Sequence, residues 1–235
     1  MSRRSIISPA VGATAGVIAL VAVATAVAAG SVPKVTIRIE GAKRTLLATK
    51  TVQVPASGSI RRFGAPSGSC PAASAAGVLN VATKGSWSGT WDSKYNDYFP
   101  VSTILGDTEN VSKSYFEILV NNVPASTGPC EIKLKAGDQL LFGAVPLSGK
   151  GYPLVIKAPT TARAGAPLKV TVDAVNGKGK SAPLTGATVT GSGATATTNT
   201  KGVATVTPKH VGKLTLGASK AGDIRAATVT VRVAS

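Results

Sequence analysis

The chain has 235 residues, of which 43% are hydrophobic and 15% are charged, and its formal net charge is +16. A hydrophobic share of this size allows a packed core and argues against wholesale disorder. The remainder is rich in Thr, Ser, Gly and Val, a composition that favours short strands and tight turns over long helices. With one histidine and two cysteines, the chain has few side chains for metal or nucleophilic chemistry.

The first 29 residues have the three parts of a secretory signal peptide. Arg3 and Arg4 give a positive start, residues 11–29 are almost wholly apolar and small, and A-x-A cleavage frames lie at 26–28 and 24–26. We therefore expect export across a bacterial cytoplasmic membrane, by either the general or the twin-arginine route. An uncleaved membrane anchor is the open alternative, because about 19 apolar residues could just span a bilayer.

Cys70 and Cys130 are the two cysteines, so they can form one pairing. In an exported protein an even pair usually means a disulfide. Closing a loop of about 60 residues would stabilise the fold by about 4 kcal/mol. A thiol nucleophile or a redox pair has no support from a C-x-x-C spacing or a second histidine. We expect a structural disulfide.

The composition changes near Tyr152-Pro153, where we expect a domain boundary. All ten aromatic residues lie at or before Tyr152. Residues 30–153 carry 13 basic and 8 acidic side chains, a net charge of +5, whereas residues 154–235 carry 11 and 2, a net charge of +9. After the signal peptide, the chain thus divides into two domains with different surfaces.

Residues 154–235 alternate between apolar and polar side chains, as half-buried strands do. The stretches 168–174 and 229–233 show this most clearly, and Gly, Asn and Pro turn signals separate the runs. Six or seven short strands in about 80 residues predict a β-sandwich. The runs PLTGATVT (183–190) and TNTKGVATV (198–206) resemble the bacterial immunoglobulin-like repeats of invasin and intimin type. This resemblance implies a stalk or a binding surface on an exported protein.

Residues 30–153 follow a different order, with a strand pair, then a short helix, then more strands. Alternation predicts strands at 35–39 and 46–54, and helical spacing of apolar residues predicts a helix at 74–83. Further strands are predicted at 115–120, 131–134 and 139–142, with a tight turn at 135–138. The fold class expected for the whole chain is mainly β, with a β-grasp-like α+β domain followed by an immunoglobulin-like β-sandwich.

Four parts of the first domain resemble the family similar to the C-terminal β-domain of transcobalamin. They are VTIRIEG (35–41), the pair Trp87 and Trp91, ILVNN (118–122) and LKAGDQL (134–140). The sequence departs from the family pattern at Gly143, where an aromatic commonly follows the final strand. In transcobalamin this domain helps to cap a corrinoid, together with a helical domain that has no counterpart in this sequence.

An aromatic cluster occupies 13 residues of a segment rich in Ser, Gly, Asn and Asp. Its members are Trp87, Trp91, Tyr95, Tyr98 and Phe99. Rings on a polar loop can stack on a sugar, lipid or peptide ligand, or can fill the space beneath a long loop. We favour packing for the two tryptophans and leave both roles open for the other three.

Catalysis is not expected. His210, the one histidine, stands in a predicted turn at 208–212, and an exposed lone histidine usually has no partner. The acidic residues Asp92, Asp97, Asp107 and Glu109 match no metal loop of fixed ligand spacing, and we expect solvated loop charges. The sequence therefore predicts a protein that is not an enzyme and that holds no metal or cofactor.

The positive charge of residues 154–235 comes largely from lysines at predicted turns and strand ends. These are Lys178, Lys180, Lys201, Lys209, Lys213 and Lys220. Summed positive charge favours anionic partners, such as a polymer of the cell envelope. Nucleic acid is disfavoured because the domain has no aromatic residue to stack on bases. Charge that only keeps the domain soluble is the alternative.

We therefore expect an exported, non-enzymatic binding or scaffold protein that is extracellular or associated with the cell envelope. The basic β-sandwich would act as a spacer or an electrostatic anchor, with an anionic envelope polymer or another surface protein as partner. Membrane contact is expected only through an uncleaved N-terminal segment. The alternative function is a soluble extracellular binder of a small molecule, for which the transcobalamin resemblance suggests a corrinoid.

Overall fold

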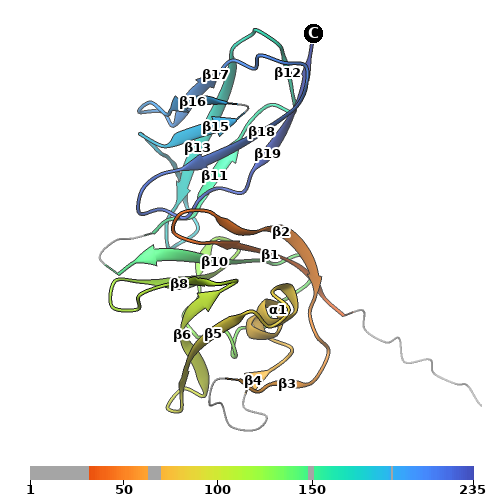
Figure 1. The fold of residues 1–235 in the computed structure, drawn as a ribbon, viewed down its shortest axis with the longest axis vertical. Coiled ribbons are helices and arrows are strands. Elements are labelled where there is room, and N and C mark those ends of the chain that lie inside the picture. The colour runs from red at the N-terminus through yellow and green to blue at the C-terminus, as the bar shows by residue number, and fades with distance from the viewer. Residues whose placement is uncertain (1–31, 63–69, 148–150, 192) are drawn as a thin grey trace, which may run out of the picture. The chain divides into compact units, whose positions relative to one another are not determined.

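The computed structural model describes residues 32–62, 70–147, 151–191 and 193–235. The predicted signal peptide lies outside these ranges. Figure 1 traces the 19 strands and the one helix of the described residues. Strands take up 51% of the described residues and helix 4%, so the prediction of a mainly-β fold is confirmed. Within the described ranges, no helix has the length and apolar character needed to cross a bilayer.

The first half of the chain is built on a five-stranded sheet in the order β2-β1-β10-β8-β9. Its strands are β1 (Lys34–Glu40), β2 (Thr45–Gln53), β8 (Ser114–Val120), β9 (Val123–Pro124) and β10 (Gln139–Pro146). The central pair, β1 and β10, is parallel and sets Ile39 opposite Phe142, whereas the other pairs are antiparallel. All of these strands except β9 agree with the sequence prediction.

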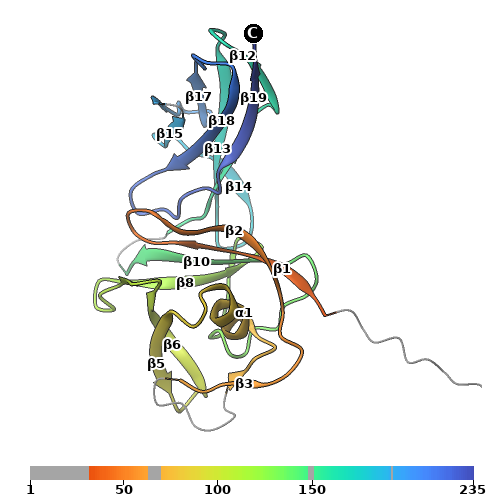
Figure 2. The same cartoon turned by 45° about the vertical axis from the view of Figure 1, so that its right-hand side comes forward.

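The helix α1 (Ala75–Ala82) lies beside one face of this sheet, as Figures 1 and 2 both show. The Ser74 side chain accepts a hydrogen bond from the Gly77 amide, which satisfies one of the donors that a helix N-terminus leaves free. Val78 and Leu79 are fully buried in the core that the sheet also contributes to. The predicted helix at 74–83 is therefore confirmed.

A disulfide joins Cys70 to Cys130, with their Cα atoms 5.1 Å apart, and confirms the predicted pairing. Cys70 belongs to β4 (Cys70–Pro71), which pairs with β3 (Ser59–Ile60). The bond thus ties this small hairpin to the segment that precedes β10.

The segment 131–134 is not a strand, so that prediction is wrong. Ile132 and Leu134 are buried in the alternating manner that suggested a strand. Their backbone follows a different course, because the carbonyl of Ile132 accepts a hydrogen bond from Ala75 at the start of α1 (3.0 Å). Alternating burial therefore arises here without a strand partner.

The aromatic segment forms strands, and the prediction of a long polar loop is wrong. The strands β5 (Trp87–Asp92) and β6 (Asp97–Ile104) form an antiparallel hairpin, and β7 (Asp107–Thr108) pairs with β6. The register of the hairpin shifts between Ser88 and Trp91. These irregularities break the period-two alternation by which a strand is recognised in sequence.

The second half has two sheets. One has the order β11-β13-β14, with β17 also paired to β13, and the other has the order β12-β19-β18-β15-β16. The first contains β11 (Leu154–Lys157), β13 (Leu168–Val175), β14 (Ser181–Pro183) and β17 (Val203–Val206). The second contains β12 (Thr161–Arg163), β15 (Thr188–Gly191), β16 (Ala194–Thr197), β18 (Gly212–Ser219) and β19 (Val229–Ala234). Nine strands replace the six or seven expected, because β12 and β14 have only three residues each, which is too short a run to be recognised by its alternation.

Both sheets of the second half contribute to one hydrophobic core. Val170 and Val172 come from β13, Leu214 and Leu216 from β18, and all four are buried. The arrangement is sandwich-like, and its core contains no aromatic side chain. The β-grasp-like and immunoglobulin-like assignments and the domain boundary at 153–154 stay predictions.

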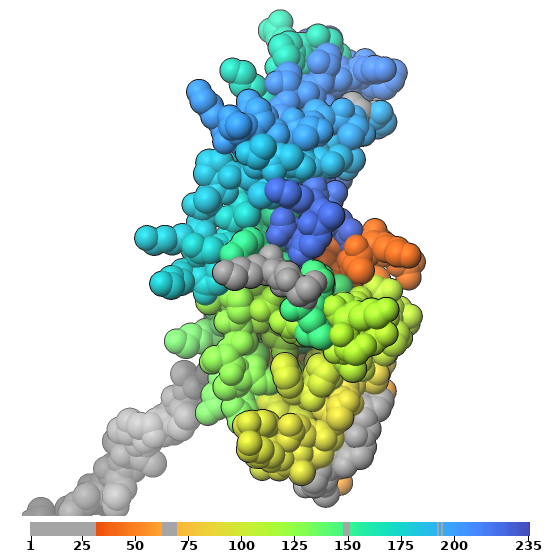
Figure 3. All heavy atoms as spheres, turned by 90° about the vertical axis from the view of Figure 1, so that its left-hand side faces the viewer, coloured from red at the N-terminus to blue at the C-terminus, as the bar shows by residue number. Residues whose placement is uncertain are grey.

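The two halves meet at the connection between β18 and β19. Ile224 from this connection is buried among Leu119, Leu141 and Val145. Gly143 on β10 leaves the space for it, since a Cβ there would lie 2.5 Å from a side-chain carbon of Ile224. Figure 3 shows atoms of this connection, in dark blue, against the orange atoms of the turn between β1 and β2. Residues 32–235 thus form one compact unit.

Candidate functional sites

The aromatic cluster divides into packed and exposed rings. Trp87 and Tyr98 are buried, and Trp91 is half-buried. The Tyr98 ring packs edge-on against both tryptophans, with centroid distances of 5.1 Å to Trp87 and 5.0 Å to Trp91. Tyr95 and Phe99 are 58% and 54% exposed. The tryptophans and Tyr98 therefore pack against the core, and Tyr95 and Phe99 keep more than half of their surface exposed.

Hydrogen bonds fix the packed rings further. The Tyr98 hydroxyl donates to the Arg62 carbonyl (2.5 Å) and accepts from the Arg62 amide (2.8 Å). The indole N–H of Trp87 donates to Oδ1 of Asn80 on α1 (3.1 Å). Burial raises the pKa of Tyr98, and its contacts with Arg62 oppose the rise. These bonds connect the hairpin to the helix and to the chain after β3.

A hollow of about 520 Å³ lies beside the exposed rings. It is lined by Tyr95 and Phe99, by Asp97 between them, by Glu131, and by the segment 125–128. Such a volume falls within the range of small-molecule sites. Two of the five predicted aromatic site residues thus border this hollow, and two carboxylates that the sequence did not single out for it join them.

Asp97 is 2% exposed, so its prediction as a solvated loop charge is wrong. Oδ1 accepts hydrogen bonds from the backbone N–H groups of Tyr98 (2.7 Å) and Cys130 (2.9 Å). Oδ2 has no hydrogen-bond partner among the described residues. Burial raises the pKa of Asp97. The N–H groups of Cys130, Tyr98 and Glu131 oppose this rise, and the charge of Glu131 adds to it.

The six predicted lysines are exposed but do not share one surface element. Lys178 and Lys180 belong to the turn between β13 and β14, and Lys201 belongs to the turn between β16 and β17. Lys220 follows β18, and Lys209 precedes it. Lys213 is the second residue of β18 and lies at a strand end, as the prediction allowed.

Lys213 lies in a row of cations that the sequence analysis missed. Its cross-strand partner is Arg232 on β19, and Arg232 also pairs with Thr161 on β12. Arg163, two residues after Thr161, points to the same side of the sheet, because side chains alternate along a strand. Arg163, Lys213 and Arg232 are all exposed, and we call these three residues the basic face. The sequence held one signal for it, since Arg163 and Arg232 are polar positions in alternating runs.

In the part of the chain that the structure describes, no acidic side chain forms an ion pair with the basic face. Residues 154–235 contain two acids. Asp173 lies on the other sheet and pairs with Lys157 at 2.9 Å. Asp223 lies in the β18–β19 connection, where it accepts a hydrogen bond from the Tyr152 amide (3.1 Å). Like charges directly opposite each other, such as Lys213 and Arg232, destabilise a sheet unless something compensates them.

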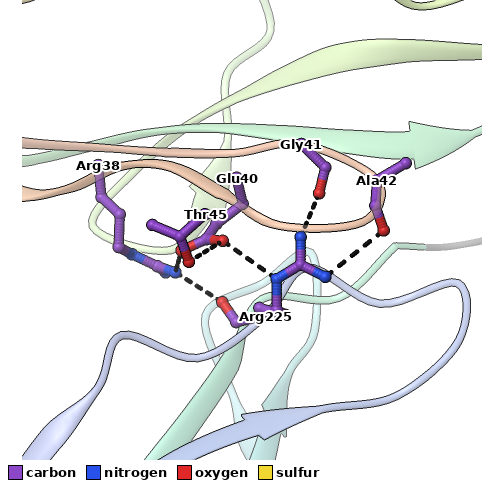
Figure 4. A network of polar contacts seen from close by, with 6 residues as sticks. All are labelled: Arg38, Glu40, Gly41, Ala42, Thr45 and Arg225. Atoms are coloured by element: carbon purple, nitrogen blue, oxygen red, sulfur yellow. Dashed lines mark hydrogen bonds and ion pairs between the residues drawn. The ribbon is translucent and has the colours of Figure 1, made fainter. Parts of the chain in front are cut away.

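A buried ion-pair network holds the junction between the halves (Figure 4). Glu40 on β1 is 1% exposed and accepts from Arg38 and Thr45 at 2.8 Å each, and it pairs with Nε of Arg225 at 3.3 Å. Arg38 also donates to the Arg225 carbonyl (2.6 Å), and Arg225 donates to the Gly41 carbonyl (2.5 Å). Both carboxylate oxygens of Glu40 are occupied, so the network serves to join the halves.

The remaining candidates for chemistry lie apart from one another. His210 is exposed, just before β18. Asp92 accepts a hydrogen bond from the Lys94 amide. Glu109 is buried and contacts the Ser114 hydroxyl, so its prediction as a solvated loop charge is wrong as well. Within the described ranges, no group of three or more His, Cys, Asp or Glu side chains is placed to hold a metal ion.

Comparisons of the chain with models of protein families, with curated proteins and with solved structures gave no match.

Proposed function

We propose that this chain is an exported, non-enzymatic binding and scaffold protein that attaches to an anionic polymer of the cell envelope through its basic face. The observation that carries the proposal is the cross-strand pair of Lys213 and Arg232. Two like charges directly opposite each other repel. An anion bound from outside would remove this repulsion, and the described part of the second half supplies no carboxylate to do so.

A polymer suits this face better than a single small anion. The three cations come from three adjacent strands, which are about 4.8 Å apart in a sheet. The exposed hydroxyls of Thr161, Thr215 and Thr230 lie on the same side, and hydroxyls can donate hydrogen bonds to anionic oxygens. An extended polyanion can contact several of these groups at once, so that weak contacts add to a useful affinity.

The junction supports the scaffold part of the proposal. Glu40 and Arg225 connect the two halves through buried polar contacts, and Ile224 does so through apolar contacts. If the polymer holds the second half, these contacts would therefore hold the first half in a fixed position relative to it. The hollow beside Tyr95 and Phe99 would then remain free for a second partner.

Binding of the purified protein to immobilised polyphosphate, across a range of NaCl concentrations, tests the proposal. The variant Arg163→Gln/Lys213→Gln/Arg232→Gln should bind about tenfold more weakly at low salt, since each lost ion pair is worth roughly 0.2–1 kcal/mol. Its affinity should also depend less on salt, because fewer ionic contacts are screened. Immobilised dextran, which is neutral, provides the blank surface.

The matched control is Lys178→Gln/Lys180→Gln/Lys201→Gln, which removes the same charge from turns outside the basic face. This variant should keep most of the affinity. Equal losses in the two variants would mean that net charge alone attracts the polymer. A wild-type protein that binds no polyanion at low salt would end the proposal.

Binding of a small molecule is the second candidate function, and the hollow of about 520 Å³ favours it. The corrinoid version rests on the transcobalamin resemblance alone. Calorimetry of the folded protein with cobalamin tests it, and a titration without heat of binding would remove corrinoids as ligands.

A further inference from the structure

The hairpin β5–β6 contains two buried polar atoms that lack hydrogen-bond partners, and no other described side chain has one. They are Nε1 of Trp91 and Oδ2 of Asp97. Buried polar groups in folded proteins are nearly always paired, so an unpaired one needs an explanation. Both atoms lie in the part of the fold that carries the exposed rings, and Asp97 also lines the hollow.

Asp97 is held in position by one oxygen, which leaves the other open. The two backbone N–H groups on Oδ1 come from Tyr98, the next residue, and from Cys130, which the disulfide anchors. Asp97 lines the hollow and is 2% exposed, so we take the hollow as the side from which a ligand would reach the carboxylate. An ionised carboxylate in such a place is costly unless a charge or further donors compensate it.

Gly128 is required for this arrangement. A Cβ at position 128 would lie 2.5 Å from Oδ2 of Asp97 and 2.4 Å from its Cγ. The backbone of Gly128 is not in the left-handed region, so its role is to provide space. The absence of a side chain at residue 128 therefore leaves room for the Asp97 carboxylate.

The rim of the hollow adds a second carboxylate and two aromatic faces. Glu131 is exposed, and its negative charge contributes to the raised pKa of Asp97. Tyr95 and Phe99 lie two positions before and after Asp97 in the sequence, and the side chains of both are more than half exposed. The Tyr95 ring already attracts one cation of the chain, because Nζ of Lys94 lies 5.0 Å from the ring centroid.

We propose that this hollow binds an ammonium or guanidinium group carried on an apolar stem, with Asp97 and Glu131 as its anionic partners and Tyr95 and Phe99 against the stem. A cation supplies the positive counter-charge that the Asp97 carboxylate lacks, and its N–H groups can donate the hydrogen bond that Oδ2 lacks. Aromatic rings attract cations and cover methylene groups. The site lies in the half without the basic face and has the opposite charge, so it does not depend on the proposed attachment.

The ligand chemistry has two sources, a lysine or arginine side chain of a partner protein and a free amine. Nuclear magnetic resonance titrations with Nα-acetyl-lysine methylamide and with n-pentylammonium distinguish them. Both should shift the backbone amide signals of Tyr98, Gly128 and Cys130 in a saturable way. Tighter binding of the lysine derivative points to a peptide partner, and equal binding points to free amines.

The matched control ligand is Nα-acetyl-norleucine methylamide, which keeps the apolar stem and lacks the charge. It should not saturate these shifts. Asp97→Asn should weaken binding of the lysine derivative about tenfold or more, while Glu117→Gln, a half-buried acid on β8 away from the hollow, should leave it unchanged. Asn can still accept both backbone hydrogen bonds through its Oδ1, so we expect this variant to fold.

Two further variants make the test independent of the buried carboxylate. Tyr95→Ala and Phe99→Ala remove exposed rings and should lower the affinity roughly threefold each without unfolding the protein. Binding that is unchanged in Asp97→Asn and in both ring variants would overturn the proposal. Saturation by the norleucine derivative equal to that by the lysine derivative would overturn it as well, because the hollow would then be an apolar site.

Discussion

The two halves of this molecule are both built from strands, yet they are stabilised in different ways. The first half has a helix, a disulfide and a core that includes Trp87, Tyr98 and Phe142. The second half relies on small aliphatic side chains between two sheets. Large rings and a covalent bond can hold irregular segments such as 125–134 in place, so the first half can build a hollow. The second half needs only regular alternation, and the outer side of its sheet carries the charges.

Removal of the disulfide should have the largest effect and should separate the halves. Cys70→Ala/Cys130→Ala should lower the free energy of unfolding of the first half by about 4 kcal/mol, because the unfolded chain regains the freedom of a long loop. The second half contains no cysteine and should keep its own stability. Hydrogen exchange resolved by residue measures both. Equal loss of protection in Val172 and Leu79 would show that the halves unfold as one.

The junction network should give the next largest effect. Glu40→Gln should destabilise the protein by about 3 kcal/mol, because it leaves the charges of Arg38 and Arg225 without their buried counter-charge. Chemical denaturation measures this loss. The matched comparison is Lys157→Gln, since the Lys157 side chain is 64% exposed in its pair with Asp173 and such pairs contribute at most about 1 kcal/mol. A Glu40 variant as stable as the Lys157 variant would show that the network contributes little to joining the halves.

The buried carboxylate of the first half predicts a dependence of stability on pH. A raised pKa in the folded state means that folded Asp97 holds its proton in a range where the unfolded chain has released it. The free energy of unfolding should therefore fall as the pH rises from the ordinary pKa of an Asp to the raised one. Asp97→Asn should lose this contribution.

Glu117 and Asp223 have pKa values raised by burial too, so the informative quantity is the difference between the wild type and Asp97→Asn. Denaturant titrations from about pH 4, near the ordinary pKa of an Asp, up to about pH 7 measure it. The variant should gain relative stability as the pH rises. A constant difference would mean that Asp97 titrates alike in the folded and unfolded chains.

The smallest expected effect on stability concerns the basic face. Lys213→Gln should raise the free energy of unfolding by up to about 1 kcal/mol at low salt, because it removes the repulsion by Arg232 across the strands. The gain should shrink as salt is added. Thermal denaturation with and without NaCl measures it. A variant less stable than the wild type at low salt would show that the two cations do not repel in the free protein.

Regular strands were predictable from the sequence because each has its own alternation, as in β1, β13 and β19. The hairpin β5–β6 was not, because its register shift and its Ser, Gly and Asp residues break the pattern. The disulfide followed from the cysteine count and the predicted export. The strand predicted at 131–134 failed because buried Ile132 and Leu134 have the spacing of a strand while their backbone meets α1.

The sites were harder to predict from the sequence because they depend on contacts between residues that lie far apart in the chain. Burial of Asp97 depends on Gly128 and on the Cys130 amide, about thirty positions away in the chain. The basic face depends on the register that sets Lys213 opposite Arg232. Such pairings are properties of the folded sheet, and the spacing of the residues in sequence does not encode them.

Fractionation of the producing cells tests the central claim most directly. The wild-type protein and the variant Arg163→Gln/Lys213→Gln/Arg232→Gln would be followed in cytoplasm, membrane, envelope and medium, before and after a wash with high salt. We predict that the wild-type protein is on the envelope and is released by salt, and that the variant is in the medium without the wash. A wild-type protein that is free in the medium, or a variant that stays on the envelope like the wild type, would contradict attachment through the basic face.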